Sequence, residues 1–200
     1  VSPIELMAER GTDIARLAMY FTAPSEKEVL WSNEGITGVE KFVLNRLMPL
    51  VKVYRGSRPD LRRYFKVEEL TTDERVIYIK LNQTIKRVDE SFERLQFNTA
   101  ISALMELCRD FEAGRIANDQ LNDQVVVKCI QMAAPMAPHV AEELWEQIGF
   151  QHSVFKSEWP VFDPAAIVGE SISVAVQVNG KLRDTVEVPT DAGQAEVEKA

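Results

Sequence analysis

The sequence of 200 residues has few of the side chains that build metal sites, disulfides and acid–base centres, with only two cysteines and two histidines. Cys108 and Cys129 lie in apolar stretches without C-x-x-C spacing, so we interpret both as buried, reduced thiols of a cytosolic protein. His139 starts an H-x-x-E-E pattern but lacks the second histidine that a zinc helix places on the same face. No metal site is therefore predicted.

Long apolar runs are also missing, since no stretch approaches the ~20 residues that a membrane-spanning helix needs. The N-terminus lacks the basic and then apolar order of a signal peptide. We expect a soluble, cytoplasmic protein with no membrane partner. No Ser-His-Asp, Cys-His or paired-carboxylate arrangement and no glycine-rich phosphate loop is found, so we predict no catalytic residue and no bound cofactor.

What the sequence does contain is apolar periodicity of about 3.6 residues, which is typical of amphipathic helices. Five or six helices with short loops predict a mainly α, up-and-down bundle. The helices and their expected signals are 3–21 with an interruption at Gly11, 36–54 with a bend near Pro49, 71–95 behind a Thr71/Glu74 capping box, a helix capped by Asn98 or Thr99, one capped by Asn122 or Asp123, and 138–148.

The last of these helices is the most compact. Pro138 suits its first position, and Gly149 suits the left-handed residue that closes it. Val140, Leu144 and Ile148 form the expected apolar stripe with Trp145 beside them, while acidic residues fill the other face. We interpret this helix as one that packs against the bundle.

After Pro160 the pattern changes to alternating polar and apolar residues, which predicts a β-hairpin at about 171–188 around Asn179-Gly180. A bulge or three-residue loop would pair Val178 with Leu182 and Val174 with Val186, which keeps the apolar face together. Ser2 is expected to cap the first helix, and another helix is expected to open at Asp191. A hairpin and a short helix bury too little to stand alone, so a truncated α/β segment is predicted.

Positive charge is concentrated in one window of a chain whose formal net charge is −8. Between residues 41 and 66 a single acid, Asp60, accompanies Lys41, Arg46, Lys52, Arg55, Arg58, Arg62, Arg63 and Lys66. Tyr54, Tyr64 and Phe65 lie among them and could stack on bases. The pattern indicates a nucleic-acid contact or a solvated basic face. Lys181 and Arg183 on the hairpin allow the same two interpretations.

Several ordered stretches resemble the bacterial-type leucyl-tRNA synthetases, a class I aminoacyl-tRNA synthetase family. They are GTDIARLAMYFTAPSEKEVLWSNEG (11–35), KFVLNRL (41–47), TIKRV (84–88), FNTAISALMEL (97–107), MAPHVAEELWEQIG (136–149), SEWPVFD (157–163) and VQVNGKLRDTVEVP (176–189). Together they cover nearly the whole chain. The Asn-Gly-Lys-Leu-Arg hairpin separates the leucyl family from its valyl, isoleucyl and methionyl relatives.

The resemblance implies an anticodon-binding-type helical domain at 36–160. It also implies a helix and loop leading out of a catalytic domain at 1–35, and a linker with the start of a C-terminal α/β domain at 161–200. HIGH-type and KMSKS-type motifs are absent, so the expected fragment begins downstream of them and has no activity alone. The parent enzyme would join leucine to its tRNA with ATP and magnesium. The implied partners are leucine tRNA and the parent's catalytic domain, in a monomer.

By this resemblance the bundle holds the tRNA body by shape. The charge pattern, interpreted with the resemblance, favours tRNA contacts at Lys41, Lys52, Arg55, Arg58, Arg62, Arg63, Lys66, Lys181 and Arg183. The chain departs from the family at Asn82 and Gln83, where a histidine and a basic residue are common, and at Asp184, where glycine is common. These departures weaken the contacts at those positions. A helical scaffold that binds proteins, or the matching domain of a valyl, isoleucyl or methionyl enzyme, are the alternatives.

Overall fold

The computed structural model describes residues 3–22, 33–167, 171–178 and 181–189. They belong to two compact units, Val1–Asp163 and Pro164–Ala200, which are described separately. The predicted Ser2 cap and the predicted helix at Asp191 lie outside the described residues. The division into three parts, 1–35, 36–160 and 161–200, stays a prediction.

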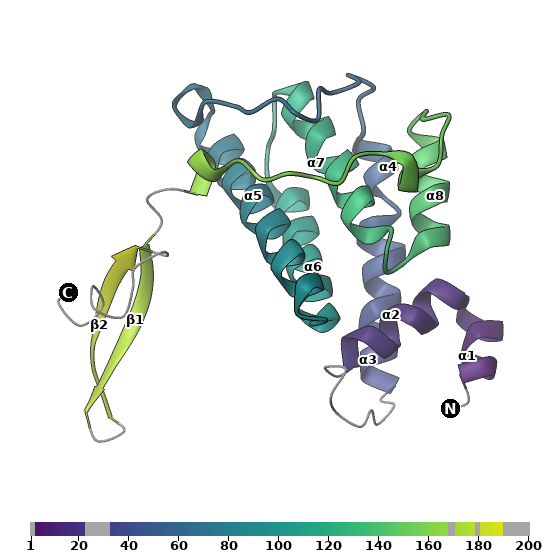
Figure 1. The fold of residues 1–200 in the computed structure, drawn as a ribbon, viewed down its shortest axis with the longest axis horizontal. Coiled ribbons are helices and arrows are strands. Elements are labelled where there is room, and N and C mark those ends of the chain that lie inside the picture. The colour runs from purple at the N-terminus through teal and green to yellow at the C-terminus, as the bar shows by residue number, and fades with distance from the viewer. Residues whose placement is uncertain (1–2, 23–32, 168–170, 179–180, 190–200) are drawn as a thin grey trace. The chain divides into compact units, whose positions relative to one another are not determined.

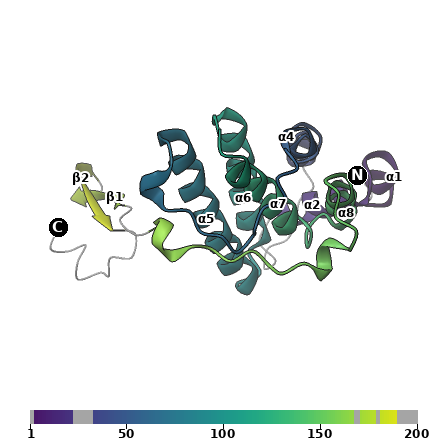
Figure 2. The same cartoon turned by 90° about the horizontal axis from the view of Figure 1, so that it is seen from above.

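The described part of the first unit is helical, which confirms the mainly α prediction (Figure 1). Its α-helices are α1 (Pro3–Arg10), α2 (Thr12–Thr22), α3 (Asn33–Phe42), α4 (Leu50–Val53), α5 (Thr72–Glu93), α6 (Phe97–Ala113), α7 (Asp119–Ala133) and α8 (Pro138–Gln147). Helices α5 and α6 form an antiparallel pair, and α7 packs against α4, α5, α6 and α8 (Figure 2). Nearly every α7 residue from Leu121 onward is buried, so α7 is the central helix of this unit.

Glycine interrupts the first predicted helix where expected. Gly11 has a φ of +90° and separates α1 from α2. The buried Asp13 at the start of α2 then accepts hydrogen bonds from the backbone N–H of Val140 at 2.7 Å and from His139 Nδ1 at 2.8 Å. An acidic group at the N-terminus of α8 also suits the helix dipole. Asp13 therefore fastens the N-terminal helices to the bundle.

The second predicted helix bends where Pro49 removes a backbone donor. After α3 the chain makes a π-helical segment, Val43–Leu47, in which the Met48 N–H donates to the Val43 carbonyl at 2.9 Å. α4 then begins directly after Pro49. The wider π-helical turn accommodates Pro49. Prolines and π-helical turns are both usual causes of a helix kink.

Two of the predicted helix starts are correct and two are wrong. Thr71 and Glu74 form both halves of a capping box on α5, and α8 begins at Pro138 as predicted. α6 instead begins at Phe97, before the expected caps. α7 is capped by Asn118, whose side chain accepts from the Leu121 N–H at 3.1 Å. The expected caps of α7, Asn122 and Asp123, lie buried inside the helix, where their side chains bind backbone groups of residues 53–57.

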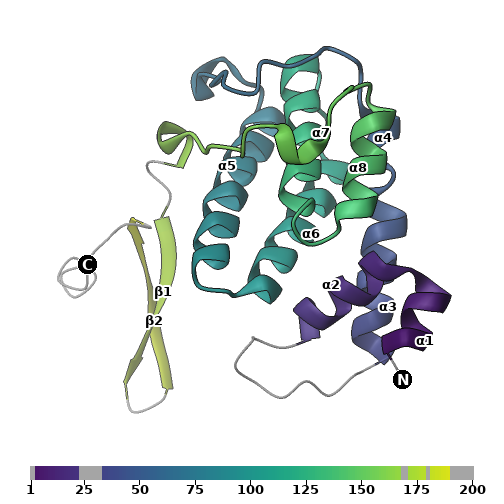
Figure 3. The same cartoon turned by 45° about the vertical axis from the view of Figure 1, so that its right-hand side comes forward.

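From α8 the chain turns into the segment 150–163, here called the strap, which crosses α7 and α5 (Figure 3). Gln131 of α7 donates to Ser157 Oγ at 3.0 Å and to the Glu158 carbonyl at 2.9 Å. At the far end, Tyr78 Oη donates to Asp163 Oδ2 at 2.8 Å, and Asn82 Oδ1 accepts from the Asp163 N–H at 2.7 Å. Asn82, where the family commonly differs, therefore has a structural role here.

The face of α8 that packs is close to the predicted one. Ala141, Leu144, Trp145 and Ile148 are buried, while Val140 is only half-buried. Glu142 is not simply solvated, because it accepts hydrogen bonds from the Ser153 hydroxyl and from the Val154 N–H. It thereby ties the start of the strap to α8.

Helices α5 and α8 end in the same hydrogen-bonded motif with different residues. In α8 the Phe150 N–H donates to the Trp145 carbonyl at 3.2 Å around Gly149, whose φ is +95°. In α5 the Gln96 N–H donates to the Ser91 carbonyl at 2.7 Å around Leu95, whose φ is +55°. A left-handed conformation disfavours a residue with a Cβ atom.

Replacing Leu95 by glycine is therefore expected to raise the free energy of unfolding by about 1 kcal/mol. Leu95 is 56% exposed, so little apolar packing is lost. Urea unfolding of Leu95→Gly measures the gain. Arg94→Gly, one residue earlier with negative φ, is the control and should destabilise the protein.

In the second unit a 3₁₀ turn (Pro164–Ile167) precedes the antiparallel strands β1 (Ser171–Val178) and β2 (Lys181–Pro189). The predicted pairing of Val174 with Val186 is confirmed, and so is an irregularity in register, between Val176 and Gln177. The predicted pairing of Val178 with Leu182 is wrong, since Val178 faces Lys181. A bulge at Arg183 restores the register, which explains both results.

Candidate nucleic-acid interface

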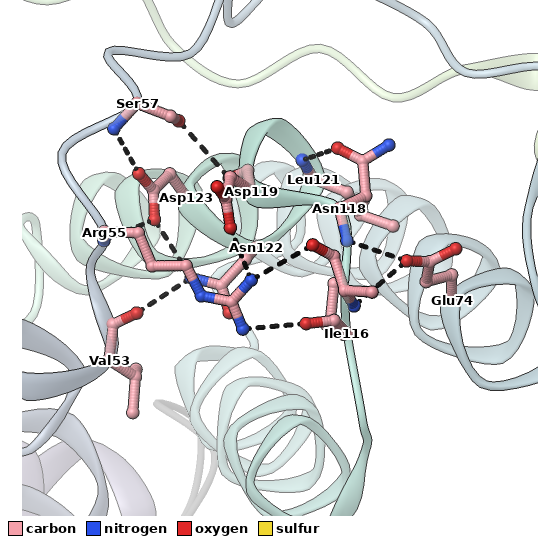
Figure 4. A network of polar contacts seen from close by, with 11 residues as sticks. Val53, Arg55, Ser57, Glu74, Ile116, Asn118, Asp119, Leu121, Asn122 and Asp123 are labelled. Carbon is pink, nitrogen blue, oxygen red and sulfur yellow. Dashed lines mark hydrogen bonds and ion pairs between the residues drawn. The ribbon is translucent and has the colours of Figure 1, made fainter.

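The basic window predicted from the sequence runs from the end of α3 through the π-helical segment and α4 into an extended segment of the first unit. This extended segment, residues 54–66, is here called the basic loop. The loop has no regular secondary structure, so side chains must hold it. The first turns of α7 supply most of them. Asp123, which is fully buried, accepts from the N–H groups of Arg55 at 2.8 Å and Ser57 at 2.7 Å (Figure 4). Gln124 Nε2 donates to loop carbonyls further along.

Further contacts complete the attachment of the loop. Gln120 Nε2 donates to the Ser57 carbonyl at 3.0 Å, and Asn122 Nδ2 donates to the Val53 carbonyl at 2.8 Å. At the other end, the Phe65 N–H donates to Tyr78 Oη at 3.0 Å. A loop held at so many backbone groups presents its remaining side chains in a defined arrangement.

Arg55 lies against the segment before α7 and stays partly exposed. Its guanidinium donates to the Ile116 carbonyl at 2.7 Å and the Ala117 carbonyl at 3.3 Å, and it pairs with Asp119 Oδ1 at 2.6 Å (Figure 4). Glu74 holds the same segment from the other side, by accepting from the Ala117 and Asn118 N–H groups at 3.1 and 2.8 Å. Arg55 therefore joins the basic loop to the segment before α7.

The pKa of Glu74 reflects this position. Burial alone would raise it, but the hydrogen bonds from the backbone of Thr71 and Asn118, together with those from the Thr71 hydroxyl and Ala117, keep the pKa of Glu74 below its ordinary value. Glu74 thus caps α5 and braces the segment before α7 as a carboxylate.

Two other predicted contacts are paired with acids at the surface. Arg62 binds both oxygens of Glu158 in the strap, with Nε–Oε2 at 2.9 Å, and Lys66 binds Glu69 at 3.0 Å. Both pairs are well exposed. Such pairs contribute little to stability, so a phosphate can replace the carboxylate at small cost.

Four of the predicted cations have no carboxylate partner among the residues that the structure describes: Lys41, Lys52, Arg58 and Arg63. All four are exposed. The guanidinium carbon of Arg63 lies 5.0 Å from the centre of the Phe65 ring, a cation–π contact that orients it. The side chains of Lys181 and Arg183 lie outside the described residues.

The aromatic residues of the loop have different roles. Phe65 is buried and packs edge-on against Tyr78, with ring centres 5.5 Å apart, so it supports the core. Tyr64 is 50% exposed and Tyr54 is half-buried. Tyr64 is therefore the ring of the loop most open to a base.

Sequence reasoning missed three anchoring residues: Asp123 and Gln124, which hold the basic loop, and Glu74, which holds the segment before α7. Their partners lie 43 to 68 positions away in the sequence, where no periodic pattern links them. A weak signal existed, since polar residues at 122–124 interrupt the otherwise apolar face of α7.

A buried lysine lies on α7 beneath the strap. Lys128 is 1% exposed, and burial lowers its pKa to about 8 despite the opposing effect of Asp163. At pH 7 the charge therefore costs stability. Lys128→Met is expected to be more stable than wild type by about 2 kcal/mol at pH 7.

The sign of the pH dependence follows from the lowered pKa of Lys128. Between about 8 in the folded chain and about 10.4 in the unfolded chain, the unfolded state binds more protons, so the wild type gains stability as the pH rises. The difference in unfolding free energy between Lys128→Met and wild type should therefore be smaller at pH 10 than at pH 7. Urea unfolding at both values measures it, and an equal gap would contradict the cost of the buried charge.

Other chemistry finds no support within the described ranges. Cys108 and Cys129 are free and buried there, as predicted. No group of three or more His, Cys, Asp or Glu side chains among those residues is arranged to hold a metal ion. None of the described helices is long and apolar enough to cross a membrane.

Comparison with known proteins adds a family to this geometry. Residues 74–199 match the family described as the anticodon-binding domain of tRNA ligase. The whole chain is 40% identical to a leucine–tRNA ligase of Laribacter hongkongensis, 37% to one of a Synechococcus strain and 34% to one of Pseudothermotoga lettingae. The chain spans 23% or 24% of the length of these relatives.

Two solved structures share the fold. The LeuRS of Agrobacterium radiobacter K84, in a ternary complex with tRNA and LeuAMS, superimposes with a TM-score of 0.75 at 24% identity. The superposition covers the whole of this chain and 26% of the Agrobacterium chain. Methionyl-tRNA synthetase of Mycobacterium tuberculosis superimposes with a TM-score of 0.52 at 14% identity. That superposition covers 82% of this chain and 39% of the synthetase chain. The first likeness extends over both units and the second over less of the chain. By its matching profile and its helical fold, the chain belongs to the anticodon-binding domain family of tRNA ligases.

Proposed function

We propose that this chain is the tRNA-binding helical part of a leucine–tRNA ligase and that α4 and the basic loop contact the phosphates of leucine tRNA. The observation that carries the proposal is an anchored loop on which the exposed Arg58 and Arg63 have no acidic partner among the described residues, in a chain of net charge −8. The likeness of the whole chain to leucine–tRNA ligases supports leucine tRNA as the partner.

The contact would be made to the tRNA body by shape and charge. Ligation of leucine with ATP and magnesium is proposed for the whole enzyme, a cytoplasmic monomer, and not for the residues described here. Lys181 and Arg183 are proposed as further contacts from the hairpin. The protein-binding scaffold remains the alternative function.

Binding of the 200-residue chain to transcribed leucine tRNA at increasing salt tests the proposal. We expect the logarithm of the affinity to fall linearly with the logarithm of salt concentration, because phosphate contacts release counterions. Leucine tRNA should also bind more tightly than heparin, a polyanion without tRNA shape. Equal binding of both, or no binding at low salt, would overturn the proposal and favour the scaffold.

A further inference from the structure

Arg63 is held at its backbone as well as at its side chain. Its N–H donates to the Asp60 carbonyl at 3.1 Å, and its carbonyl accepts from Gln124 Nε2 at 3.0 Å. Its guanidinium lies over the Phe65 ring, 5.0 Å from the ring centre. No other cation among the described residues lies over an aromatic ring in this way. Arg63 is therefore oriented before any ligand binds.

The ring beneath Arg63 is itself fixed by Tyr78 of α5. Phe65 is buried, and its ring meets the Tyr78 ring at 77° with ring centres 5.5 Å apart. The Phe65 N–H also donates to Tyr78 Oη at 3.0 Å. Because Phe65 contacts Tyr78 through both its ring and its backbone, it has little freedom to move away from Arg63.

The Tyr78 hydroxyl holds the strap as well as the basic loop. Tyr78 is 1% exposed, and its Oη donates to Asp163 Oδ2 at 2.8 Å. Burial raises the pKa of Tyr78 above its ordinary value, so the hydroxyl keeps its proton and remains a donor at neutral pH. One buried oxygen thus accepts from the loop and donates to the strap. An unbroken series of contacts therefore runs from the end of the strap to Arg63.

The orientation of a guanidinium affects how tightly it binds a phosphate. A free arginine side chain loses rotamer freedom when a phosphate fixes it, and one already held over a ring loses less. The N–H donors lie in the plane of the group, so they stay available to a phosphate. Arg62, by contrast, is paired with Glu158 of the strap. Arg63 offers a phosphate an oriented cation from which no carboxylate of the described residues has to be displaced.

We propose that Tyr78 and Phe65 are positioning residues for tRNA binding, which hold the Arg63 guanidinium in place for one phosphate. This role rests on the proposed function, because Arg63 belongs to the same surface. Tyr78 is buried beneath the basic loop, so its effect on the affinity for tRNA has to pass through Arg63.

A double-mutant cycle on the 200-residue chain tests this role, with anisotropy of labelled leucine tRNA at low salt as the measurement. Tyr78→Phe removes only the hydroxyl and should weaken binding about threefold. Arg63→Gln removes the cation and should weaken it about tenfold. The double variant should also lose about tenfold, because Tyr78 has no further effect once the cation is gone. A loss of about thirtyfold, the product of two independent effects, would overturn the proposal.

Thr84→Val is the matched control for the loss of a buried hydroxyl. Thr84 lies on the same helix, is 2% exposed and donates to the Lys80 carbonyl at 2.8 Å, so its hydrogen bond stays within α5. Thr84→Val should lower the free energy of unfolding, as Tyr78→Phe does, but leave the affinity for tRNA unchanged. If both variants weaken tRNA binding equally, loss of stability and not positioning is the cause, and the proposal fails.

Arg63→Lys tests the same role at an exposed side chain, where the fold is not at risk. Lysine keeps the charge but lacks the planar group that lies over Phe65, so binding should weaken about threefold. Arg58→Lys, in the same loop and without a ring beneath it among the described residues, should change the affinity less than about twofold. Equal losses at the two positions would contradict the positioning of Arg63.

Nuclear magnetic resonance of the chain without tRNA gives a readout that is independent of binding. The ring current of Phe65 should shift the δ-CH₂ protons of Arg63 upfield of those of Arg58. Phe65→Leu, which keeps an apolar side chain but has no ring, should abolish this difference. Arg63 signals without an upfield shift in the wild type would rule out the oriented guanidinium.

These experiments also separate the positioning role from the proposed function. Salt-dependent tRNA binding without coupling between Tyr78 and Arg63 would overturn the positioning role alone. If the chain does not bind leucine tRNA at low salt, the proposed function fails, whatever the Arg63 signals show.

Discussion

Asp123→Asn is expected to lower the free energy of unfolding by about 3 kcal/mol. The Asp123 side chain is fully buried, and its two oxygens accept from the N–H groups of Arg55 and Ser57. An amide of the same shape has only one acceptor oxygen, so its NH₂ group would face one of these donors. A buried donor left without an acceptor loses its full desolvation energy.

Asp119→Asn is the matched control, because Asp119 pairs with Arg55 from an exposed position on the same helix. Its loss should cost less than about 1 kcal/mol. Urea unfolding monitored by circular dichroism measures both variants. Similar losses for the two aspartates would mean that the surface pair, and not the buried carboxylate, holds the basic loop.

Lys52, Arg58 and Arg63 have no carboxylate partner within the described ranges. Reversing these charges in the triple variant Lys52→Glu, Arg58→Glu and Arg63→Glu is expected to weaken binding of leucine tRNA about 100-fold at low salt. The plot of log affinity against log salt concentration should become less steep by about three, since each cation is proposed to neutralise one phosphate. Fluorescence anisotropy of labelled tRNA measures both quantities. The variant should keep its fold, because all three side chains are exposed.

The control for this experiment changes the net charge equally at another surface. The control variant carries Lys86→Glu, Arg87→Glu and Arg94→Glu. These residues lie in the second half of α5 or just after it, away from the basic loop. This variant should lose affinity only through the weaker long-range field, by a few-fold. If it binds as poorly as the first variant, net charge and not a local surface determines the affinity, and the site lies elsewhere.

The cations of the basic loop show how far sequence reasoning reached toward the candidate site. The predicted tRNA contacts between residues 41 and 66 all have exposed side chains, but their contact with tRNA stays a prediction. The sequence could not show which of these cations are bound within the protein and which have no acidic partner among the described residues. Arg55 and Arg58 look equivalent in the sequence, yet Arg55 bonds to the segment before α7, whereas Arg58 has no acidic partner among the described residues.

The sequence by itself determined the features that depend on residues within one helical turn. The capping box at Thr71, the bend at Pro49 and the end of α8 at Gly149 all follow from local sterics and from donors or acceptors three to five positions away. The tertiary structure decided the features that require distant partners. Asn122 and Asp123 look like helix caps in sequence, but packing against α7 gives Asn122 a partner at the end of α4 and Asp123 partners in the basic loop, which leaves the cap to Asn118. Such a choice depends on which donors and acceptors the folded chain brings within hydrogen-bonding distance, and local propensity contains no information on that.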